Sequence, residues 1–313
     1  MIYWLHLVGR RIAVVLPLGV SYRLAEGGGW VAYWLWPAKR RHAVANLRQI
    51  LGPRAAGRAE GLARAAFRNY GKYLIDMLRL SGAQLKEIEQ RLTVHGLEHV
   101  EAARAHGRGL IFVGGHIGNS DVGGAILAGR GYPAHVIAET LQPPRWNTLV
   151  QETRRQAGMQ VIPVEAGARE VLRVLRRNEV LAFLVDRPTH RERSGVPVQF
   201  FGAWTRVPAG AATLALRTGA SLIAACVVRA GHGYEVHISP PLQIQRSGDL
   251  QADIQALTQQ VMSALEGFIR QHPDQWFMFR PMWPATEAGP IVETATSMAG
   301  HDAAGDRGAA PSW

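Results

Sequence analysis

A histidine and an aspartate, His116 and Asp121, follow an apolar run and are separated by five positions. The run 110–115 reads Leu-Ile-Phe-Val-Gly-Gly, which is typical of a buried sheet strand. In open α/β folds, ligands bind beyond the carboxyl ends of the strands, where this pair would lie. A carboxylate that accepts a proton from one imidazole nitrogen leaves the other nitrogen free as a base, so the pair is a candidate for general-base catalysis.

The two side chains can meet only if the chain turns between them. On one continuous helix, residues five positions apart point about 140° away from each other. Three glycines in the segment permit a turn, because glycine reaches backbone conformations closed to other residues. Asn119 or Ser120 can then cap the next helix, with Asp121 in its first turn. The segment alone fits a solvated loop histidine and an ordinary capping aspartate equally well.

Length and charge limit the classes of protein. The chain has 313 residues and 47% hydrophobic content, enough for one large α/β domain with additions or for two small domains. Of its net charge of +11, most lies in residues 1–80, where thirteen Lys and Arg face three acidic residues. Such a basic segment, rich in Trp and Tyr, suits an anionic membrane surface. Nucleic acid is the competing partner, but no zinc-finger, ribonucleoprotein or recognition-helix pattern is found, so we expect no nucleic-acid binding.

The N-terminal segment holds two apolar runs, 12–20 and 30–37. Neither reaches the roughly 20 residues that a membrane-spanning helix needs. No small-residue cleavage site follows the first run, which argues against a cleaved signal peptide. We expect an interfacial or partly inserted anchor with Lys39, Arg40 and Arg41 on the cytoplasmic side. The alternative is a buried pair of aromatic helices.

The chain divides into three predicted regions. Residues 1–92 are expected to form a helical, membrane-associating region. It includes an apolar stripe, expected to pack on the main domain, formed by Leu62, Ala66, Tyr70, Tyr73, Met77 and Leu80. Residues 93–285 are expected to form an α/β domain, and residues 286–313, with little to bury, a disordered tail.

Strand and helix patterns alternate within the α/β region. The predicted strands are 109–114, 134–138, 160–164, 180–185, 197–201, 221–228 and 233–238. The predicted helices are 121–129, 144–157, 168–177, 208–218 and 250–271. This alternation predicts an α/β fold with a mostly parallel central sheet flanked by helices.

Other chemistries find little support. The single cysteine, Cys226, lies in an apolar run and is expected to be a small core residue. The histidines show no paired ligand spacing, so we expect no metal site. No Gly-x-Gly-x-x-Gly follows the first strand, which argues against a nucleotide-binding domain.

Three blocks of sequence together resemble one family. The blocks are Gly114–Asp121; Val185–Arg187 with Gly195–Gly202 and Ala211–Ala220; and His272–Trp283. They look like the lipid A biosynthesis lauroyl/myristoyl acyltransferases, a family that includes the phosphatidylinositol mannoside acyltransferases within the wider lysophospholipid acyltransferase group. The resemblance covers roughly residues 1–285.

Two positions depart from the pattern of the lipid A branch. Asp121 stands where that branch usually has Glu, and Ser120 where it usually has Trp. The run 137–141 with the prolines after it resembles the mannoside branch somewhat more. The resemblance therefore indicates the reaction more firmly than the acceptor.

The resemblance implies transfer of a fatty acyl group from a thioester, acyl-ACP or acyl-CoA, to a hydroxyl of a glycolipid, without a cofactor. His116 would act as general base, oriented by Asp121. The acceptor would be a lipid A precursor or, alternatively, a phosphatidylinositol mannoside or other glycoglycerolipid. Acyl carrier protein is a candidate partner because the entry surface is basic. The expected location is the cytoplasmic face of the inner membrane. A non-catalytic lipid-binding protein on the same fold is the rival of another class.

Four further residues are candidates for substrate binding: Asn119, Arg187, Arg145 and Glu139. Arg187 follows an apolar strand and could bind a phosphate, or could form a loop salt bridge with Asp186. Arg145 is a second phosphate candidate or a solvated helix-start residue. Glu139 could line the pocket or make a structural hydrogen bond. Backbone N–H groups at 114–118 or a nearby arginine could stabilise an oxyanion, and an acyl groove or the core could include Val113, Ile117, Phe200 and Phe201.

Overall fold

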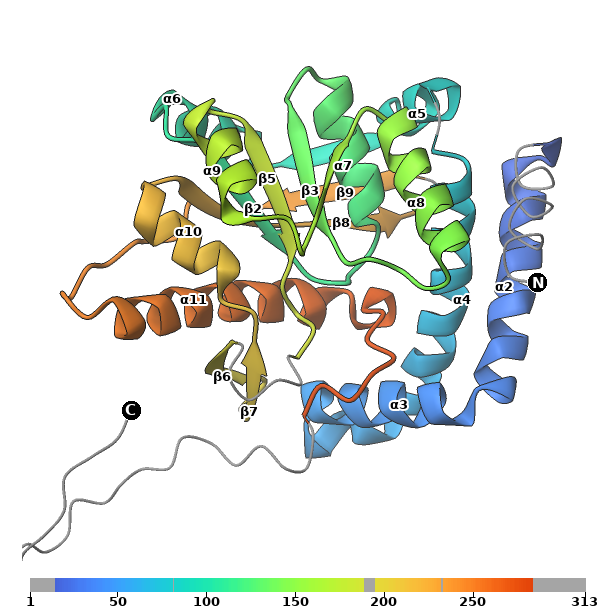
Figure 1. Ribbon diagram of the computed structural model, residues 1–313. Coiled ribbons are helices and arrows are strands. Elements are labelled where there is room, and N and C mark those ends of the chain that lie inside the picture. Colours follow the sequence, from blue (N-terminus) through green and yellow to red (C-terminus); the bar gives the residue numbers. More distant parts are fainter. Residues whose placement is uncertain (1–14, 81, 189–194, 232, 284–313) are drawn as a thin grey trace, which may run out of the picture.

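A seven-stranded sheet forms the centre of the protein in the computed structural model, which describes residues 15–80, 82–188, 195–231 and 233–283 (Figure 1). The strand order is β1-β9-β8-β2-β5-β3-β4. All neighbouring strands are parallel except β8 and β9. The strands are β1 (Leu92–His95), β2 (Leu110–Gly114), β3 (Ala134–Ala138), β4 (Gln160–Pro163), β5 (Val180–Leu184), β8 (Ser221–Ala230) and β9 (Gly233–Ile238).

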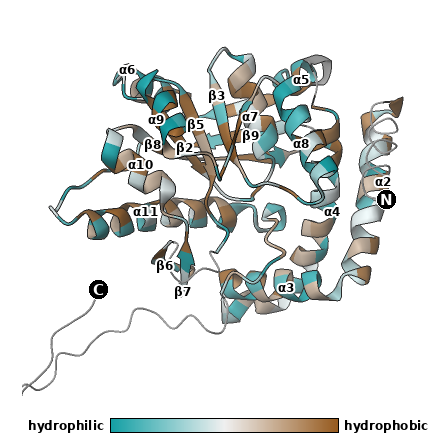
Figure 2. Ribbon diagram, viewed as in Figure 1, coloured by the Kyte–Doolittle hydropathy of each residue, from teal (hydrophilic) through white to brown (hydrophobic). Residues whose placement is uncertain are grey.

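Helices cover both faces of this sheet. The largest hydrophobic core lies between the sheet and three helices, α9 (Ala168–Arg176), α10 (Gly210–Thr218) and α11 (Leu250–Gln271). On the opposite face lie α5 (Gly82–Glu89), α6 (Leu97–Ala105) and α7 (Ser120–Gly129), while α8 (Pro144–Gln156) packs beside β4. Because helices bury both faces, the central strands read as continuous apolar runs rather than alternating ones, as the brown strands show (Figure 2).

The N-terminal helices pack against one side of this α/β unit (Figure 1). They are α2 (Leu18–Leu35), α3 (Pro37–Leu51), the short η1 (Pro53–Arg58) and α4 (Ala59–Leu78). A Cβ on Gly29 of α2 would come within 2.4 Å of the carbonyl oxygen of Phe67 on α4. The close approach of these helices therefore depends on glycine. Within the described residues, no helix is both long enough and apolar enough to cross a bilayer.

The structure confirms the predicted mostly parallel α/β fold and each predicted strand and helix of the α/β region, within one or two residues at most ends. One assignment needs correction. The strand predicted at 197–201 is β6 (Val196–Phe200), which pairs with β7 (Ala203–Val207) in a separate antiparallel sheet. The short β1, α6 and β7 were not predicted. The predicted tail, 286–313, lies outside the described residues.

Candidate active site

Parallel strands bring the candidate residues to one edge of the sheet. β2 pairs with β5 and β5 with β3, all in parallel, so their carboxyl ends lie together. His116 follows β2, Asp186 and Arg187 follow β5, and Glu139 follows β3 directly. Three separate stretches of sequence therefore supply polar side chains to the same place.

His116 is held by Asp186. The imidazole Nδ1 lies 2.6 Å from Oδ1 of Asp186, and the backbone N–H of His116 donates to Oδ2 of the same carboxylate at 2.8 Å. The indole N–H of Trp276 also donates to Oδ2, at 3.0 Å. Asp186 is fully buried. With Nδ1 donating to the carboxylate, Nε2 is left unprotonated and can accept a proton from a substrate.

The predicted pairing of His116 with Asp121 is therefore wrong. Asp121 lies in the first turn of α7, as predicted, but its two oxygens are bonded elsewhere. Oδ1 accepts from Nε of Arg154 at 2.7 Å, and Oδ2 accepts from the hydroxyl of Tyr73 at 2.7 Å. Asp121 thus connects α7 to α8 through Arg154 and to α4 through Tyr73.

Both aspartates are ionised despite their burial. Burial acts to raise the pKa of Asp186, but the charge and hydrogen bonds of His116, with the Trp276 indole, outweigh it and lower that pKa. Burial also acts to raise the pKa of Asp121, and there Arg154 and Tyr73 lower it, with a smaller contribution from His116. The charges of both His116 and Arg154 lower the pKa of Asp121, so the His116–Asp186 pair and the Asp121–Arg154 pair interact electrostatically.

The turn between His116 and α7 requires one glycine in particular. Gly118 has a φ of +61°, and a Cβ there would lie 1.9 Å from the carbonyl oxygen of Val227. The end of η2 (Pro273–Gln275) and the residues after it fix this turn, because Gly118 N–H donates to the Gln275 carbonyl at 2.8 Å and Phe277 N–H to the His116 carbonyl at 2.7 Å. The block His272–Trp283 therefore holds the turn in the block Gly114–Asp121 in place.

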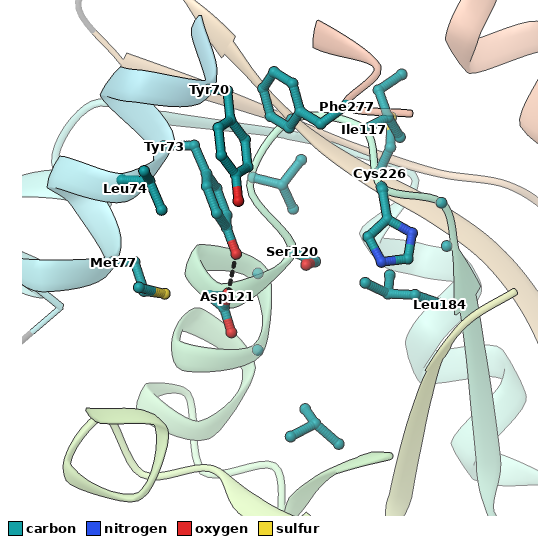
Figure 3. A pocket seen from close by; sticks show the side chains of 18 of the residues that line it. Tyr70, Tyr73, Leu74, Met77, Ile117, Ser120, Asp121, Leu184, Cys226 and Phe277 are labelled. Carbon is teal, nitrogen blue, oxygen red and sulfur yellow. Dashed lines mark hydrogen bonds between the residues drawn. The ribbon is translucent and has the colours of Figure 1, made fainter. Parts of the chain in front are cut away.

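A cavity of about 1160 Å³ opens beside His116. This exceeds the roughly 300–1,000 Å³ usual for small-molecule sites. His116, Ser120 and Asp121 line it together with Tyr70 and Tyr73 of α4 (Figure 3). Most of the remaining lining is apolar. It extends on one side between α2 and α4 and on the other toward α6.

Of the other predicted site residues, two lie at this cavity and two do not line it. Nη1 of Arg187 lies 2.6 Å from Oε2 of Glu139, and both residues line the cavity. Arg187 therefore pairs with Glu139 and not, as in the alternative considered from the sequence, with Asp186. Arg145 is exposed at the start of α8. Asn119 is buried, and its side-chain oxygen caps α7 by accepting from Val122 N–H at 3.2 Å.

The structure decides between some of the alternatives left open for the oxyanion donors and the acyl groove. The N–H groups of His116 and Gly118 are already bonded, to Asp186 and to the Gln275 carbonyl. All four candidates for the acyl groove belong to the largest core, and of these Val113 and Ile117 also border the cavity, whereas Phe200 and Phe201 do not. Cys226 is buried, and burial raises the pKa of its thiol to about 12, so it is no nucleophile at neutral pH.

Three residues of the site were missed: Asp186, Arg154 and Tyr73. A signal for Asp186 was present, because an acidic residue directly after a predicted parallel strand lies at the ligand-binding edge. Tyr73 was placed in the apolar stripe and expected only to pack. Nothing in the local sequence marks Arg154, whose partner lies on another helix.

A partly exposed histidine held by a buried carboxylate lies over a mostly apolar cavity at the carboxyl edge of a mostly parallel sheet, and this arrangement is typical of enzymes that activate a hydroxyl or water by general-base catalysis. The family model for bacterial lipid A biosynthesis acyltransferases matches residues 1–284. The chain therefore belongs to this family and is an acyltransferase.

Its relatives include both branches of the family. It is 32% identical over 289 residues to the phosphatidylinositol mannoside acyltransferase of Mycobacterium tuberculosis (strain CDC 1551 / Oshkosh), covering 90% of this chain and 88% of that protein. The enzyme of the same name from Mycolicibacterium smegmatis is 31% identical, covering 87% of this chain and 84% of that protein. A lipid A biosynthesis acyltransferase of Haemophilus influenzae is 28% identical, covering 61% and 58%.

Proposed function

We propose that this acyltransferase moves a fatty acyl group from acyl-ACP or acyl-CoA to a hydroxyl of a glycolipid, with His116 as general base. The hydrogen bond between His116 and Asp186 carries this proposal. Nε2 takes the proton of the acceptor hydroxyl while its oxygen attacks the thioester carbon. The carbon–sulfur bond then breaks, and the thiolate leaves with the proton from the imidazolium, which Asp186 stabilises in the meantime.

The cavity supplies what else the reaction needs. Arg154 lines it and places a positive charge in its wall, suited to a developing oxyanion. The arm toward α6 is apolar and includes Val100, Phe112 and Ile238. Phe112 lies four residues before His116, or about 13 Å along an extended chain. This approaches half of the roughly 30 Å hydrocarbon thickness of a bilayer, so a long acyl chain suits the arm.

A phosphatidylinositol mannoside or other glycoglycerolipid is the favoured acceptor. The relatives named for the mannoside reaction match at higher identity and over more of the chain than the relative named for lipid A. A lipid A precursor is the second candidate.

The exposed aromatic face of α2 supports a location at the cytoplasmic face of the inner membrane. The side chains of Trp30, Trp34 and Trp36 are each more than half exposed. Arg40 lies over the ring of Trp34, and Lys39 lines the cavity. Aromatic rings flanked by cations suit the headgroup layer, and a lipid acceptor could reach the cavity there.

Purified protein would be incubated with a long-chain acyl-ACP or acyl-CoA and vesicles containing one acceptor each: a phosphatidylinositol mannoside, a glycosyl diacylglycerol or a lipid A precursor. We expect acyl transfer by the wild type and none by His116→Ala. His106→Ala, which changes an exposed histidine outside the cavity lining, should retain activity. Full activity of His116→Ala would exclude the proposed base, and turnover of the lipid A precursor alone would reverse the order of acceptors.

A further inference from the structure

Two hydroxyl groups at the cavity take no part in the reaction proposed above. They belong to Tyr70 on α4 and Ser120 on α7, both of which line the cavity (Figure 3). Among the residues that the structure describes, neither hydroxyl has a hydrogen-bond partner. Its spacing predicts only a packing role for Tyr70, and Ser120 is notable in the sequence only as a departure from the tryptophan of the lipid A branch.

The structure brings these two hydroxyls to the same part of the cavity. The ring of Tyr70 stacks on that of Tyr73, with centroids 5.5 Å apart and planes inclined by 19°. The two phenol oxygens therefore point in similar directions (Figure 3). Since the Tyr73 hydroxyl donates to Asp121, the residue after Ser120, the phenol of Tyr70 lies near the N-terminus of α7.

The unpaired state of Tyr70 differs from that of three other tyrosines at or near this helix, of which Tyr22 and Tyr73 are likewise partly buried and Tyr234 is buried. Tyr73 donates to Asp121, and Tyr22 and Tyr234 both donate to Asp76. Buried polar groups are almost always hydrogen-bonded within the protein, whereas the partly buried phenol of Tyr70 lies at a cavity wall without a protein partner and is available to a ligand. Burial raises the pKa of Tyr70, and the hydroxyl therefore stays neutral and can both donate and accept at neutral pH.

The available groups also indicate the chemistry of the ligand. Arg187 and Arg154 are charged and suit the anionic parts of the substrates, and each contacts a carboxylate. Two neutral hydroxyls instead match other neutral hydroxyls, which donate and accept equally. The small side chain of Ser120 leaves room for such a group where an aromatic side chain would occupy space.

We propose that Tyr70 and Ser120 form a subsite for the acceptor headgroup, binding sugar hydroxyls next to the one that is acylated. This inference rests on the proposed function, since it assigns the acceptor of the same reaction to a polyhydroxylated class. The two residues position the headgroup, and His116 alone takes the proton.

Acyl-transfer kinetics of Tyr70→Phe, Ser120→Ala and the double variant would test this. One acceptor would be a glycosyl diacylglycerol and the other a long-chain alcohol without a sugar. We expect each single substitution to raise the KM for the glycolipid about 3- to 10-fold, the loss typical of one hydrogen bond. The KM for the alcohol, the KM for the donor and kcat should not change.

Tyr33→Phe is the matched control, because it removes one phenol oxygen from a ring on α2 outside the cavity lining. An unchanged glycolipid KM in both single variants would overturn the subsite. A fall in kcat with both acceptors, or a raised KM for the donor, would also overturn it, since the hydroxyls would then serve the donor or the fold.

Binding of a soluble alkyl glycoside by calorimetry separates the subsite from turnover. The double variant should bind it more weakly than the wild type and should bind the matching alkyl alcohol equally well. Equal binding of the glycoside overturns the subsite even if the enzyme is active. Absence of acyl transfer by the wild type, together with weaker glycoside binding by the variant, would instead contradict only the proposed reaction.

Discussion

Nδ1 of His116 lies 2.6 Å from the carboxylate of Asp186, seventy positions further along the chain. The carboxylate is fixed by two further donors, the backbone N–H of His116 and the indole of Trp276. Asp121, only five positions from the histidine, holds Arg154 and Tyr73 instead. The two aspartates therefore have separable roles, one in orienting the base and one in holding three helices together.

The main effect of Asp186→Asn should be on kcat, not on the free energy of unfolding. The amide is isosteric but no longer stabilises an imidazolium or fixes the right tautomer, a defect that can cost about 10⁴-fold in comparable triads. Asp121→Asn should have the opposite profile. It leaves the largely buried Arg154 without its counter-ion, and breaking a buried pair typically costs up to about 3–5 kcal/mol.

Steady-state kinetics and urea unfolding of both variants would check this contrast. A kcat for Asp186→Asn within threefold of the wild type would contradict the assigned role of Asp186. An unfolding free energy of Asp121→Asn equal to that of the wild type would contradict the structural role of Asp121.

Acid should destabilise the protein through these buried carboxylates. Burial acts to raise the pKa of Asp121, but Arg154 and Tyr73 bring it below the ordinary value of 3.8. The unfolded state therefore binds the proton more readily, so the stabilisation is complete above about pH 4 and is lost as the pH falls through the folded pKa. Urea unfolding between pH 7 and pH 2.5 should show a plateau and then a decline, and Asp121→Asn should show a shallower decline. An equally steep decline in the variant would assign the acid sensitivity to other groups.

The difference between the two aspartates also shows which features of the fold and site can be predicted from the sequence. Periodicity identified β2 and β5, because buried parallel strands are apolar runs of recognisable length. It could not identify the partner of His116, because the choice between residues 121 and 186 depends on side-chain direction after a turn. Likewise, Tyr70 and Met77 fit an apolar stripe by spacing alone, yet both also line the cavity, since spacing does not reveal where a packed face becomes a cavity wall.

Gly115→Ala should impair catalysis by displacing the carboxylate that orients the base. A Cβ on Gly115 would lie 3.0 Å from Oδ2 of Asp186, and Asp186 has no room to retreat because it is fully buried. We expect kcat to fall about tenfold or more, because small displacements of catalytic groups have large effects. Gly210→Ala is the control, since nothing lies within 4 Å of the added atom and the residue is helical. Equal kcat values for the two variants would mean that the carboxylate tolerates displacement.

Arg187→Gln should raise the KM for a phosphorylated substrate and leave stability nearly unchanged. Its pair with Glu139 is partly exposed, with side chains 31% and 52% accessible, and such pairs contribute about 0–1 kcal/mol. We propose that the guanidinium of Arg187 binds a phosphate of the substrate at the cavity, so its removal should raise the KM about tenfold. Glu139→Gln keeps the cation and is the matched variant. Loss of stability without a change in KM would show that the pair is structural.

Replacing Trp30, Trp34 and Trp36 together by Ser should weaken binding to vesicles that contain anionic lipid. Fully burying one large apolar side chain contributes about 1.5–3 kcal/mol, so even partial insertion of three indoles predicts a loss of tenfold or more in partitioning. Leu250→Ser, which changes an exposed apolar residue at the start of α11, is the control and should partition like the wild type. Sedimentation with vesicles of increasing anionic content would measure both. Because Trp36 lines the cavity, the triple variant should also lose turnover of vesicle-bound acceptor while retaining turnover of a detergent-dispersed one. Equal losses in vesicles and in detergent would mean that the indoles support the fold rather than docking.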